Sequence, residues 1–333
     1  MQVLIYENFL SKMTKKSGVG KAITHQKKAL DLMAVTYTDS VKDSFDVAHF
    51  NFYDPFAYFT MKRLKKKNIP IVVHAHSTEE DFRNSFVFSN QIAPFFKKWL
   101  IKFYSVGDVI ITPTPYSKKL IKNYGITVPI FDLSNGIDLN EWQLDSGLKK
   151  YFNQLHNITP QTKVIMNIGF PIERKGVFDF IEISKQLPNY EFYWLGETPK
   201  ALQKRKITKA ISNAPKNCHF LGYTSGVNKM AAFNRADCFF FPSYEETEGI
   251  VVLEALAMHL PIIIRNIPVY DDWIIDKKHA YKGNNNNEFI DLITNITNQK
   301  LPDLTKAGYK IAANKDIKII GEKLVNIYQS IIK

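Results

Sequence analysis

The chain has 333 residues, enough for two domains that each bury a sizeable core, and its hydrophobic (45%) and charged (23%) contents are ordinary for a globular protein. Its formal net charge of +12 favours an acidic partner, such as nucleic acid, an anionic lipid surface or a phosphorylated small molecule. No apolar run reaches the roughly 18 residues of a membrane span, and the first ten residues do not resemble a signal peptide. We therefore expect a globular protein that remains in the cytoplasm.

The first half of the chain alternates short apolar runs with helical stretches. The run Val3–Tyr6 predicts a buried strand, and residues 16–30 predict a glycine-containing turn followed by a helix. Further strand-like runs occur at 45–50, 69–76, 107–114 and 128–136. After Asn140 the pattern weakens, and the polar, mixed stretch 142–161 is predicted to be a linker.

The alternation then resumes. Strands are predicted at 163–170, 190–196, 218–223, 238–243 and 261–265, with helices between them, and a periodic helix is predicted at 316–332. Strands alternating with helices indicate parallel sheets buried on both faces, so we expect an α/β fold with two doubly wound, Rossmann-like domains. Their predicted bounds are 1–145 and 160–312, and the C-terminal segment 313–333 is a candidate to pack back on the first domain.

Residues that directly follow strands carry most information in such a fold, because ligands bind beyond the carboxyl ends of parallel strands. The segment 242–264, which we call the acidic segment, holds four glutamates and no Lys or Arg. A helix is predicted from about Gly249 to His259. A carboxylate at the start of a helix gains roughly 0.3–1 kcal/mol from the helix dipole, which is a sufficient structural reason for Glu245, Glu246 and Glu248.

Glu254 differs from these three because it interrupts an otherwise apolar helix. A buried carboxylate is costly without a partner, and a pair of sugar hydroxyls would serve. The backbone N–H groups of Gly249, Ile250 and Val251 at the helix start form a ready phosphate site. Arg174 and Lys175 follow another strand and are placed to meet phosphate, although a solvated basic turn is the simpler interpretation.

Other strand ends give weaker signals. Gly18 and Gly20 allow a close backbone approach to a ligand, but they do not complete a dinucleotide-binding fingerprint. His74 and His76 are predicted to lie on one face of a strand end. Either a structural role or a contact with a ligand would explain them. We find no third ligand for a metal and no Asp-x-Asp pair. Cys218 and Cys238 lie in apolar stretches, which indicates buried, reduced thiols.

Together these stretches resemble the retaining glycosyltransferases of family 4, which have the GT-B fold. The acidic segment resembles the family's Glu-x7-Glu signature, with Glu246 and Glu254 eight residues apart. The stretches SGVG, SNGID, GFPIERKG and FLGY match in the family's order. The resemblance extends over nearly the whole chain. More narrowly, KSGVGKAITHQKKAL and HAHSTEEDFRNSF resemble the diacylglycerol α-glucosyltransferases of Gram-positive bacteria, which make the monoglucosyl-diacylglycerol of lipoteichoic acid anchors.

The resemblance implies roles for the donor, UDP-glucose. Glu254 would hydrogen-bond the ribose hydroxyls, Glu246 would lie against the hexose, and Lys175 with the N–H groups from Gly249 onward would hold the diphosphate. The match also implies that Gly18 and Gly20 keep the first loop close to the donor and that Gly222 and Tyr223 contribute to nucleotide binding. His76 would touch the hexose near the reacting carbon, and His74 is less favoured.

One departure concerns the phosphate site, because the family usually has Arg where this chain has Phe170; Arg174 is the candidate replacement. In the implied mechanism, cations and helix N–H groups stabilise the departing diphosphate, and the acceptor hydroxyl attacks from the same face with retention. These cations could replace a metal, so neither a metal nor another cofactor is expected.

The acceptor implied by the resemblance is diacylglycerol at an anionic membrane, on the inner face of the cell membrane. The stretch 83–104 contains Lys97, Lys98, Trp99 and Lys102, and Phe95, Trp99 and Phe103 recur with helical spacing as one apolar stripe. Basic and aromatic residues favour a membrane interface, but a core-packing helix with a solvated basic side has the same pattern. The basic run Lys62–Lys67 is a second candidate.

Two other functions remain as alternatives. The first is a family-4 enzyme with another nucleotide sugar or with a soluble or polyprenyl-linked acceptor, which assays with diacylglycerol would separate. The second is a non-enzymatic binding protein for sugar nucleotides or nucleic acid. No RNA- or DNA-binding motif is visible, so we expect no nucleic-acid partner. Intact Lys175, Glu246, Glu254 and His76 argue against an inactive enzyme.

Overall fold

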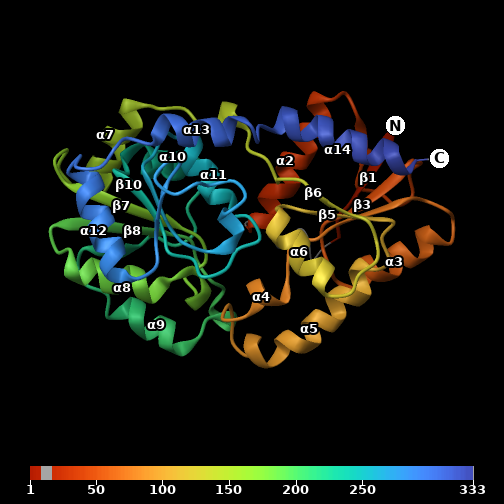
Figure 1. Cartoon of the computed structure of the whole chain (residues 1–333), viewed down its shortest axis with the longest axis horizontal. Coiled ribbons are helices and arrows are strands. Elements are labelled where there is room, and N and C mark those ends of the chain that lie inside the picture. The colour runs from red at the N-terminus through yellow and green to blue at the C-terminus, as the bar shows by residue number, and fades with distance from the viewer. Residues whose placement is uncertain (9–16, 333) are drawn as a thin grey trace. The chain divides into compact units, whose positions relative to one another are not determined.

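The computed structural model describes residues 1–8 and 17–332 and contains two compact units (Figure 1). The first unit contains Met1–Glu80, Gln91–Asp138 and Asn314–Lys333. The second contains Asp81–Asn90 and Leu139–Ala313. No helix of the described residues is long and apolar enough to cross a membrane.

The first unit is built on a six-stranded parallel sheet. Its strands are β1 (Gln2–Tyr6), β2 (Thr36–Thr38), β3 (Val47–Phe50), β4 (Ile71–His74), β5 (Val109–Thr112) and β6 (Ile130–Asp132). Their spatial order is β2-β1-β3-β4-β5-β6. The helices along this part of the chain are α2 (Gly18–Leu32), α3 (Pro55–Lys65), α4 (Glu79–Phe82), α5 (Ser89–Tyr104) and α6 (Pro115–Asn123), joined by α14 (Ile317–Ile331) from the C-terminus.

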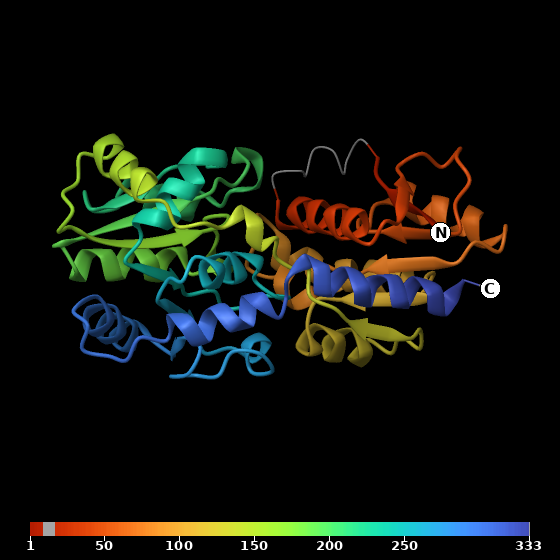
Figure 2. The same cartoon turned by 90° about the horizontal axis from the view of Figure 1, so that it is seen from above.

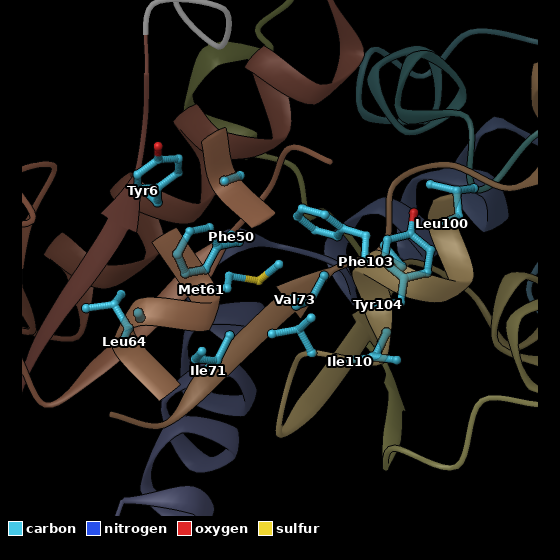
Figure 3. Close-up of a cluster of buried hydrophobic side chains, with 14 of the residues drawn as sticks. Tyr6, Phe50, Met61, Leu64, Ile71, Val73, Leu100, Phe103, Tyr104 and Ile110 are labelled. Carbon is cyan, nitrogen blue, oxygen red and sulfur yellow. The ribbon is translucent and has the colours of Figure 1, made fainter. Parts of the chain in front are cut away.

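Alternating side chains of this sheet face two different helix layers. Val3 and Ile5 pack with residues of α2 and α14, whereas Leu4 and Tyr6 pack with residues of α3, α5 and α6. Figure 3 shows the second layer, where Phe50, Met61 and Phe103 point into one buried cluster. Both faces of the sheet are therefore covered, which explains why its strands read as continuous apolar runs.

The C-terminal helix α14 lies against α2, and Figure 2 shows it in blue on the first unit. A Cβ atom on Gly321 would stand only 2.9 Å from the carbonyl oxygen of Ala29. Glycine at this position lets the two helices approach closely. The capping side chain of Asp316 accepts a hydrogen bond from the Lys318 N–H at the start of α14.

The second unit has its own six-stranded parallel sheet. Its strands are β7 (Lys163–Ile168), β8 (Tyr190–Leu195), β9 (Cys218–Phe220), β10 (Cys238–Phe241), β11 (Ile262–Arg265) and β12 (Tyr281–Gly283), in the order β12-β11-β10-β7-β8-β9. Its helices are α7 (Ser146–Leu155), α8 (Val177–Gln186), α9 (Arg205–Ser212), α10 (Gly226–Arg235), α11 (Ile250–Ala257), α12 (Asn286–Thr297) and α13 (Thr305–Ala313). Four short 3-10 turns complete the elements: η1 (Leu139–Glu141), η2 (Glu173–Lys175), η3 (Lys200–Leu202) and η4 (Pro268–Tyr270).

Aromatic side chains fill both faces of this second sheet. Phe180 of α8 packs edge-on against Trp194 at 5.1 Å on one face. On the other face, Phe152 of α7 lies 5.1 Å from the ring of Tyr193. Two parallel six-stranded sheets with helices on both faces confirm the predicted α/β class with two doubly wound units.

The stretch predicted to be a linker, 142–161, contains an ordered helix instead. Asp145 begins α7, and its carboxylate accepts hydrogen bonds from the N–H groups of Gly147 and Leu148. Phe152 of this helix is 2% exposed and packs on the second unit's sheet. The linker prediction was wrong for these residues because a capped amphipathic helix with many polar positions has low average hydrophobicity.

Candidate functional site

A glycine turn after β7 brings two cations to the end of β10. Arg174 and Lys175 form η2, which ends at Gly176 with a left-handed φ of 75°. A Cβ atom on Gly176 would lie 2.6 Å from the carbonyl oxygen of Pro242, so glycine is required for this close approach. The turn therefore places Lys175 beside the acidic segment.

The acidic segment meets these cations through Glu246. Lys175 donates to Oε1 of Glu246, Ser243 Oγ donates to the same oxygen at 2.6 Å, and Nη1 of Arg174 lies 3.6 Å from it. Arg174 also donates to the carbonyl oxygen of Glu245 at 2.5 Å. We call Arg174, Lys175, Ser243 and Glu246 the donor cluster. It combines four side chains from two strand ends.

Burial and pairing oppose one another in the donor cluster. Burial would raise the pKa of Glu246, but the charges of Lys175 and Arg174 and two hydrogen bonds lower it below its usual value. Burial lowers the pKa of Lys175, and the Glu246 carboxylate limits that change. The carboxylate is thus held ionised against an ammonium group, as expected for a site prepared for charged ligands.

Helix α11 starts next to this cluster. Gly249 is the N-cap residue, with a left-handed φ of 85°, and as glycine it has no side chain to cap the helix. A Cβ atom on Gly249 would lie 3.2 Å from the hydroxyl of Tyr270, which is fully buried and has no hydrogen-bond partner within the described part of the chain. The first N–H groups, at Ile250 and Val251, have no carbonyl one turn earlier in the helix to pair with. This helix start can receive an anion.

Glu254 lies on the second turn of α11 and is 1% exposed. Its partner in the free protein is Lys229 of α10, whose Nζ is 2.7 Å from Oε2. Lys229 also lies over the ring of Trp142, at 5.1 Å. Sequence reasoning found the unusual glutamate but missed Lys229, because one lysine in an amphipathic helix looks like a solvated residue.

Three glycines meet at the carboxyl ends of β7, β8 and β9. A Cβ atom on Gly196 would lie 2.2 Å from the carbonyl oxygen of Gly169, and the Gly196 N–H donates to the carbonyl oxygen of Gly222 at 2.7 Å. Tyr223 follows and is 45% exposed. Phe170 packs into the apolar cluster with Phe86 at 6.3 Å, so it supplies no charge. Arg174, together with Lys175, supplies the positive charge beside Glu246.

The predicted residues of the first unit lie in two places. Gly18 and Gly20 form the first turn of α2, where Ser17 Oγ accepts the Gly20 N–H at 3.3 Å. The rings of His74 and His76 stack at 4.0 Å with an interplanar angle of 10°, so both lie on one face as expected. His76 and His74 are 7% and 8% exposed.

Helix α5 divides the predicted apolar stripe between core and surface. Phe95 is 70% exposed, but Phe103 points into the buried cluster (Figure 3). Trp99 Nε1 donates to the carbonyl oxygen of Tyr53 at 2.5 Å. The stripe as a whole is therefore not a surface, because Trp99 and Phe103 anchor the helix to the core. Exposed aromatics also occur on neighbouring α3, at Phe56 and Phe59.

The lysines of α5 differ in their partners. Lys97 pairs with Glu79 at 3.2 Å and lies over the ring of Tyr124 at 4.4 Å. Lys98 and Lys102 are exposed, and Lys102 lies 5.2 Å from the ring centre of Tyr58 on α3. The surface formed by Phe56, Phe59, Phe95, Lys98 and Lys102 is named the α3–α5 surface below.

Neither cysteine takes part in these sites. Cys218 and Cys238 are free and buried, and burial raises the pKa of Cys218 to about 11. Over residues 1–8 and 17–332, no three His, Cys, Asp or Glu side chains are grouped so that they could hold a metal ion.

Comparisons with known proteins confirm the predicted GT-B fold. Residues 150–313 match the family Glycosyl transferases group 1, and residues 29–141 match Glycosyltransferase Family 4. The whole chain is 44% identical to the processive diacylglycerol alpha-glucosyltransferase of Acholeplasma laidlawii, over 99% of that protein. It is 24% identical to the alpha-galactosylglucosyldiacylglycerol synthase of Streptococcus pneumoniae, over 79% of this chain and 73% of that one. The structure of Anabaena HepE with UDP and glucose has a TM-score of 0.78 at 14% identity, covering 99% of both chains.

Proposed function

The chain belongs to glycosyltransferase family 4, and from this premise we propose that it transfers glucose from UDP-glucose to the free hydroxyl of 1,2-diacylglycerol with retention of configuration. The observation that carries the proposal is the partly buried Lys175–Glu246 pair beside the start of α11, where the N-cap residue is a glycine. The lipid acceptor is supported by the full-length relative that is named for diacylglycerol. We assign the nucleotide sugar to the second unit and the acceptor to the first.

The donor cluster supplies charge where the reaction needs it. When glucose leaves, negative charge grows on the diphosphate, and Lys175, Arg174 and the N–H groups of Ile250 and Val251 would stabilise it. Because these groups are already fixed by Glu246 and by the helix, little reorganisation is needed during the reaction. We propose that Glu246 then contacts the hexose.

The remaining donor contacts follow from single residues. We propose that Glu254 accepts hydrogen bonds from the ribose hydroxyls, with Lys229 supporting its charge. The exposed ring of Tyr223, after the open turn at Gly222, is suited to contact the nucleotide. His76 is proposed to hydrogen-bond a hydroxyl near the reacting carbon. The acceptor oxygen would attack from the face that the diphosphate leaves, so no carboxylate nucleophile is required.

The acceptor is insoluble, so the enzyme must work at a lipid surface. We propose that the α3–α5 surface rests on the anionic inner face of the cell membrane. Its exposed phenylalanines suit the interface, and each of its lysines would add about 1 kcal/mol of attraction. The exposed basic residues Lys62, Lys65, Lys66 and Lys67 at the end of α3 extend the same charge.

The relative's name also says that it is processive. We propose that this chain likewise accepts its own glucosylated lipid, so that products with more than one glucose accumulate with time. The resemblance in sequence motifs alone predicted a single transfer. The two cases differ in whether purified monoglucosyl-diacylglycerol is consumed.

The test is incubation of the protein with several radiolabelled nucleotide sugars and diacylglycerol in mixed micelles, with and without EDTA. We expect label from UDP-glucose in the lipid phase, α-linked, at similar rates in both conditions. Label from another sugar, or transfer only to a soluble or polyprenyl-linked acceptor, would contradict the proposed substrates. Loss of activity in EDTA that Mg²⁺ or Mn²⁺ restores would contradict the proposed role of the cations.

A further inference from the structure

Five buried polar side chains of the first unit form one hydrogen-bonded series, which we call the histidine network: His76, Asn51, Gln26, Tyr328 and His49. His76 and Asn51 follow strands β4 and β3, whereas Gln26 lies on α2 and Tyr328 on α14. All five are at most 7% exposed. The network therefore joins the last helix of the chain to a histidine at a strand end.

Each contact in the network has a defined direction. Oδ1 of Asn51 can only accept, so Nε2 of His76, 3.0 Å away, carries the proton. Nδ2 of Asn51 donates to Oε1 of Gln26 at 2.9 Å, and Nε2 of Gln26 donates to the hydroxyl of Tyr328 at 3.0 Å. Reversing the Gln26 amide alone would place donor against donor, and reversing the Asn51 amide alone would place acceptor against acceptor.

The far end of the network completes this order. Because the Tyr328 oxygen accepts the Gln26 N–H, its own proton is available for Nδ1 of His49, at 2.7 Å. The amide of Gln26 and the hydroxyl of Tyr328 thus set the orientation of the Asn51 side chain. That side chain, in turn, determines which nitrogen of His76 holds the proton.

We propose that Asn51 is a positioning residue for His76, and that Gln26 and Tyr328 hold it so that the His76 proton stays on Nε2. Nδ1 then keeps its lone pair and accepts a hydrogen bond from a hydroxyl of the sugar or of the acceptor. This inference rests on the proposed function, because the fixed tautomer matters for catalysis only if His76 contacts substrate.

The surroundings of the network favour a fixed geometry. Gly321 brings α14 within close reach of Ala29 on α2, one turn from Gln26 and two turns from Tyr328. The ring of His74 stacks on His76 and makes no hydrogen bond to any described residue at either nitrogen. Asn51 therefore orients His76 through a hydrogen bond, and the flat ring of His74 supports it by stacking.

The network is also neutral. The titratable groups in or next to the network, besides His76, are His74 from the β4 end, His49 from β3 and Tyr328 from α14, while α2 contributes the neutral Gln26. Burial lowers the pKa of His76 to about 3, so the Nδ1 lone pair is available throughout the usual working range. A negative charge in place of Asn51 would raise that pKa by stabilising the imidazolium.

The experiment uses the full-length protein with Asn51→Asp, Tyr328→Phe and the control Tyr281→Phe, which removes a buried hydroxyl that donates to the Pro302 carbonyl oxygen in the second unit. We expect ¹⁵N NMR of the wild type to show His76 protonated at Nε2. Tyr328→Phe should mix the two tautomers and lower kcat roughly tenfold with little change in KM for UDP-glucose. Tyr281→Phe should change neither.

Asn51→Asp adds a readout that a purely structural role would not alter. The activity of this variant should fall on the acid side, as pH decreases through the raised pKa of His76, where the wild type stays active. A wild-type His76 protonated at Nδ1, or an unchanged acid limb in a folded Asn51→Asp protein, would overturn the inference. Full activity of His76→Ala would instead overturn the proposed contact of His76 with substrate, while the NMR result would still test the network.

Discussion

The two units each bury a polar group of side chains at their strand ends, but the groups are of opposite kinds. The donor cluster of the second unit consists of charges, with Lys175 and Arg174 around the Glu246 carboxylate. The histidine network of the first unit consists of neutral side chains that are ordered by two amides and a hydroxyl. Both are largely shielded from water, so hydrogen bonds within each group replace those that water would make, although Nε2 of His49 has no partner among the described residues.

The difference matches the ligands that we assign to each unit. A diphosphate carries charge, and a cation that is already paired with Glu246 can turn to it without ever being buried alone. Sugar and glycerol hydroxyls are neutral. A neutral imidazole whose Nδ1 lone pair has a fixed direction can accept a hydrogen bond from such a hydroxyl. The comparison predicts that the two clusters respond differently to pH and to removal of charge.

Acid should destabilise the first unit before the second. Burial lowers the folded-state pKa of His49 and His76 to about 3, and that of His74 falls well below its usual value. Below the usual pKa of 6.5 the unfolded chain binds more protons, so the free energy of unfolding decreases by about 1.4 kcal/mol per pH unit for each histidine. In the second unit burial also lowers the pKa of His156 and His279, but both are less buried than the three histidines of the first unit. The pKa of Glu246 is lowered, so its contribution is complete above pH 4.5 and is lost only below that value.

Hydrogen exchange at pH 7.5 and 5.5, corrected for intrinsic rates, would measure this difference. We expect peptides within residues 17–80 to lose protection first. His74→Leu is the matched variant, because His74 makes no hydrogen bond to a described residue; the change removes its titration and replaces its ring stacking on His76 with an aliphatic contact. It should reduce the pH sensitivity of the first unit by about 1.4 kcal/mol per pH unit. Equal losses in both units would contradict the comparison.

Removing the central cation should have the largest effect on turnover. Lys175→Met takes away a charge assigned to the departing diphosphate and leaves Glu246 buried with Arg174 and Ser243 alone. We expect kcat to fall by about 10²–10³-fold, or roughly 3–4 kcal/mol. The control is Lys163→Met, which removes a lysine that donates to the Thr297 carbonyl oxygen elsewhere in the second unit. Similar rates for both variants would show that Lys175 is not at the reacting phosphate.

Glu254→Gln should weaken nucleotide binding more than it weakens the fold. The amide keeps the shape but loses a charge-assisted hydrogen bond to the ribose, so UDP affinity measured by calorimetry should fall by about 1.5–3 kcal/mol. Glu248→Gln is the control, because Glu248 is equally buried in the same segment. Unchanged affinity for Glu254→Gln would remove this residue from the nucleotide site.

Lys229 allows a finer test of the same carboxylate. Lys229→Met leaves Glu254 buried without its cation, which is costly. The double variant, Lys229→Met with Glu254→Gln, removes both charges. We therefore expect the double variant to resist urea better than Lys229→Met alone. The opposite order would show that Lys229 stabilises the fold by packing on Trp142 and not by pairing with Glu254.

The sequence predicted the fold well because parallel strands leave a strong local signal. A short apolar run such as residues 262–264, between turn residues, indicates a buried parallel strand. Glycines after strands mark positions where two backbone segments approach closely, as at Gly176. Glu254 was also detectable from sequence, because a charge inside an apolar helix is a local anomaly.

The partners of these residues could not be predicted, because they depend on distant parts of the chain. Lys229 meets Glu254, and Tyr328 meets Gln26, only after the sheets and helices have packed. The stripe on α5 failed for a related reason. Helical spacing shows that Phe95, Trp99 and Phe103 are neighbours, but it does not show where the core ends and the surface begins.

The smallest expected effect concerns the α3–α5 surface, which carries charge outside both buried clusters. Lys98→Gln with Lys102→Gln removes two exposed positive charges, and Lys97→Gln is the control because Lys97 is already paired with Glu79. At about 1 kcal/mol per lysine, binding to anionic vesicles at low salt should fall by about 30-fold for the double variant and less for the control. High salt should reduce the difference in vesicle binding between wild type and double variant, since it screens exposed charges.

Because the donor cluster is untouched in this double variant, its activity on a short-chain acceptor in detergent should persist. Equal co-sedimentation of wild type and double variant at low salt would contradict the use of this surface and make Lys62–Lys67 the next region to test.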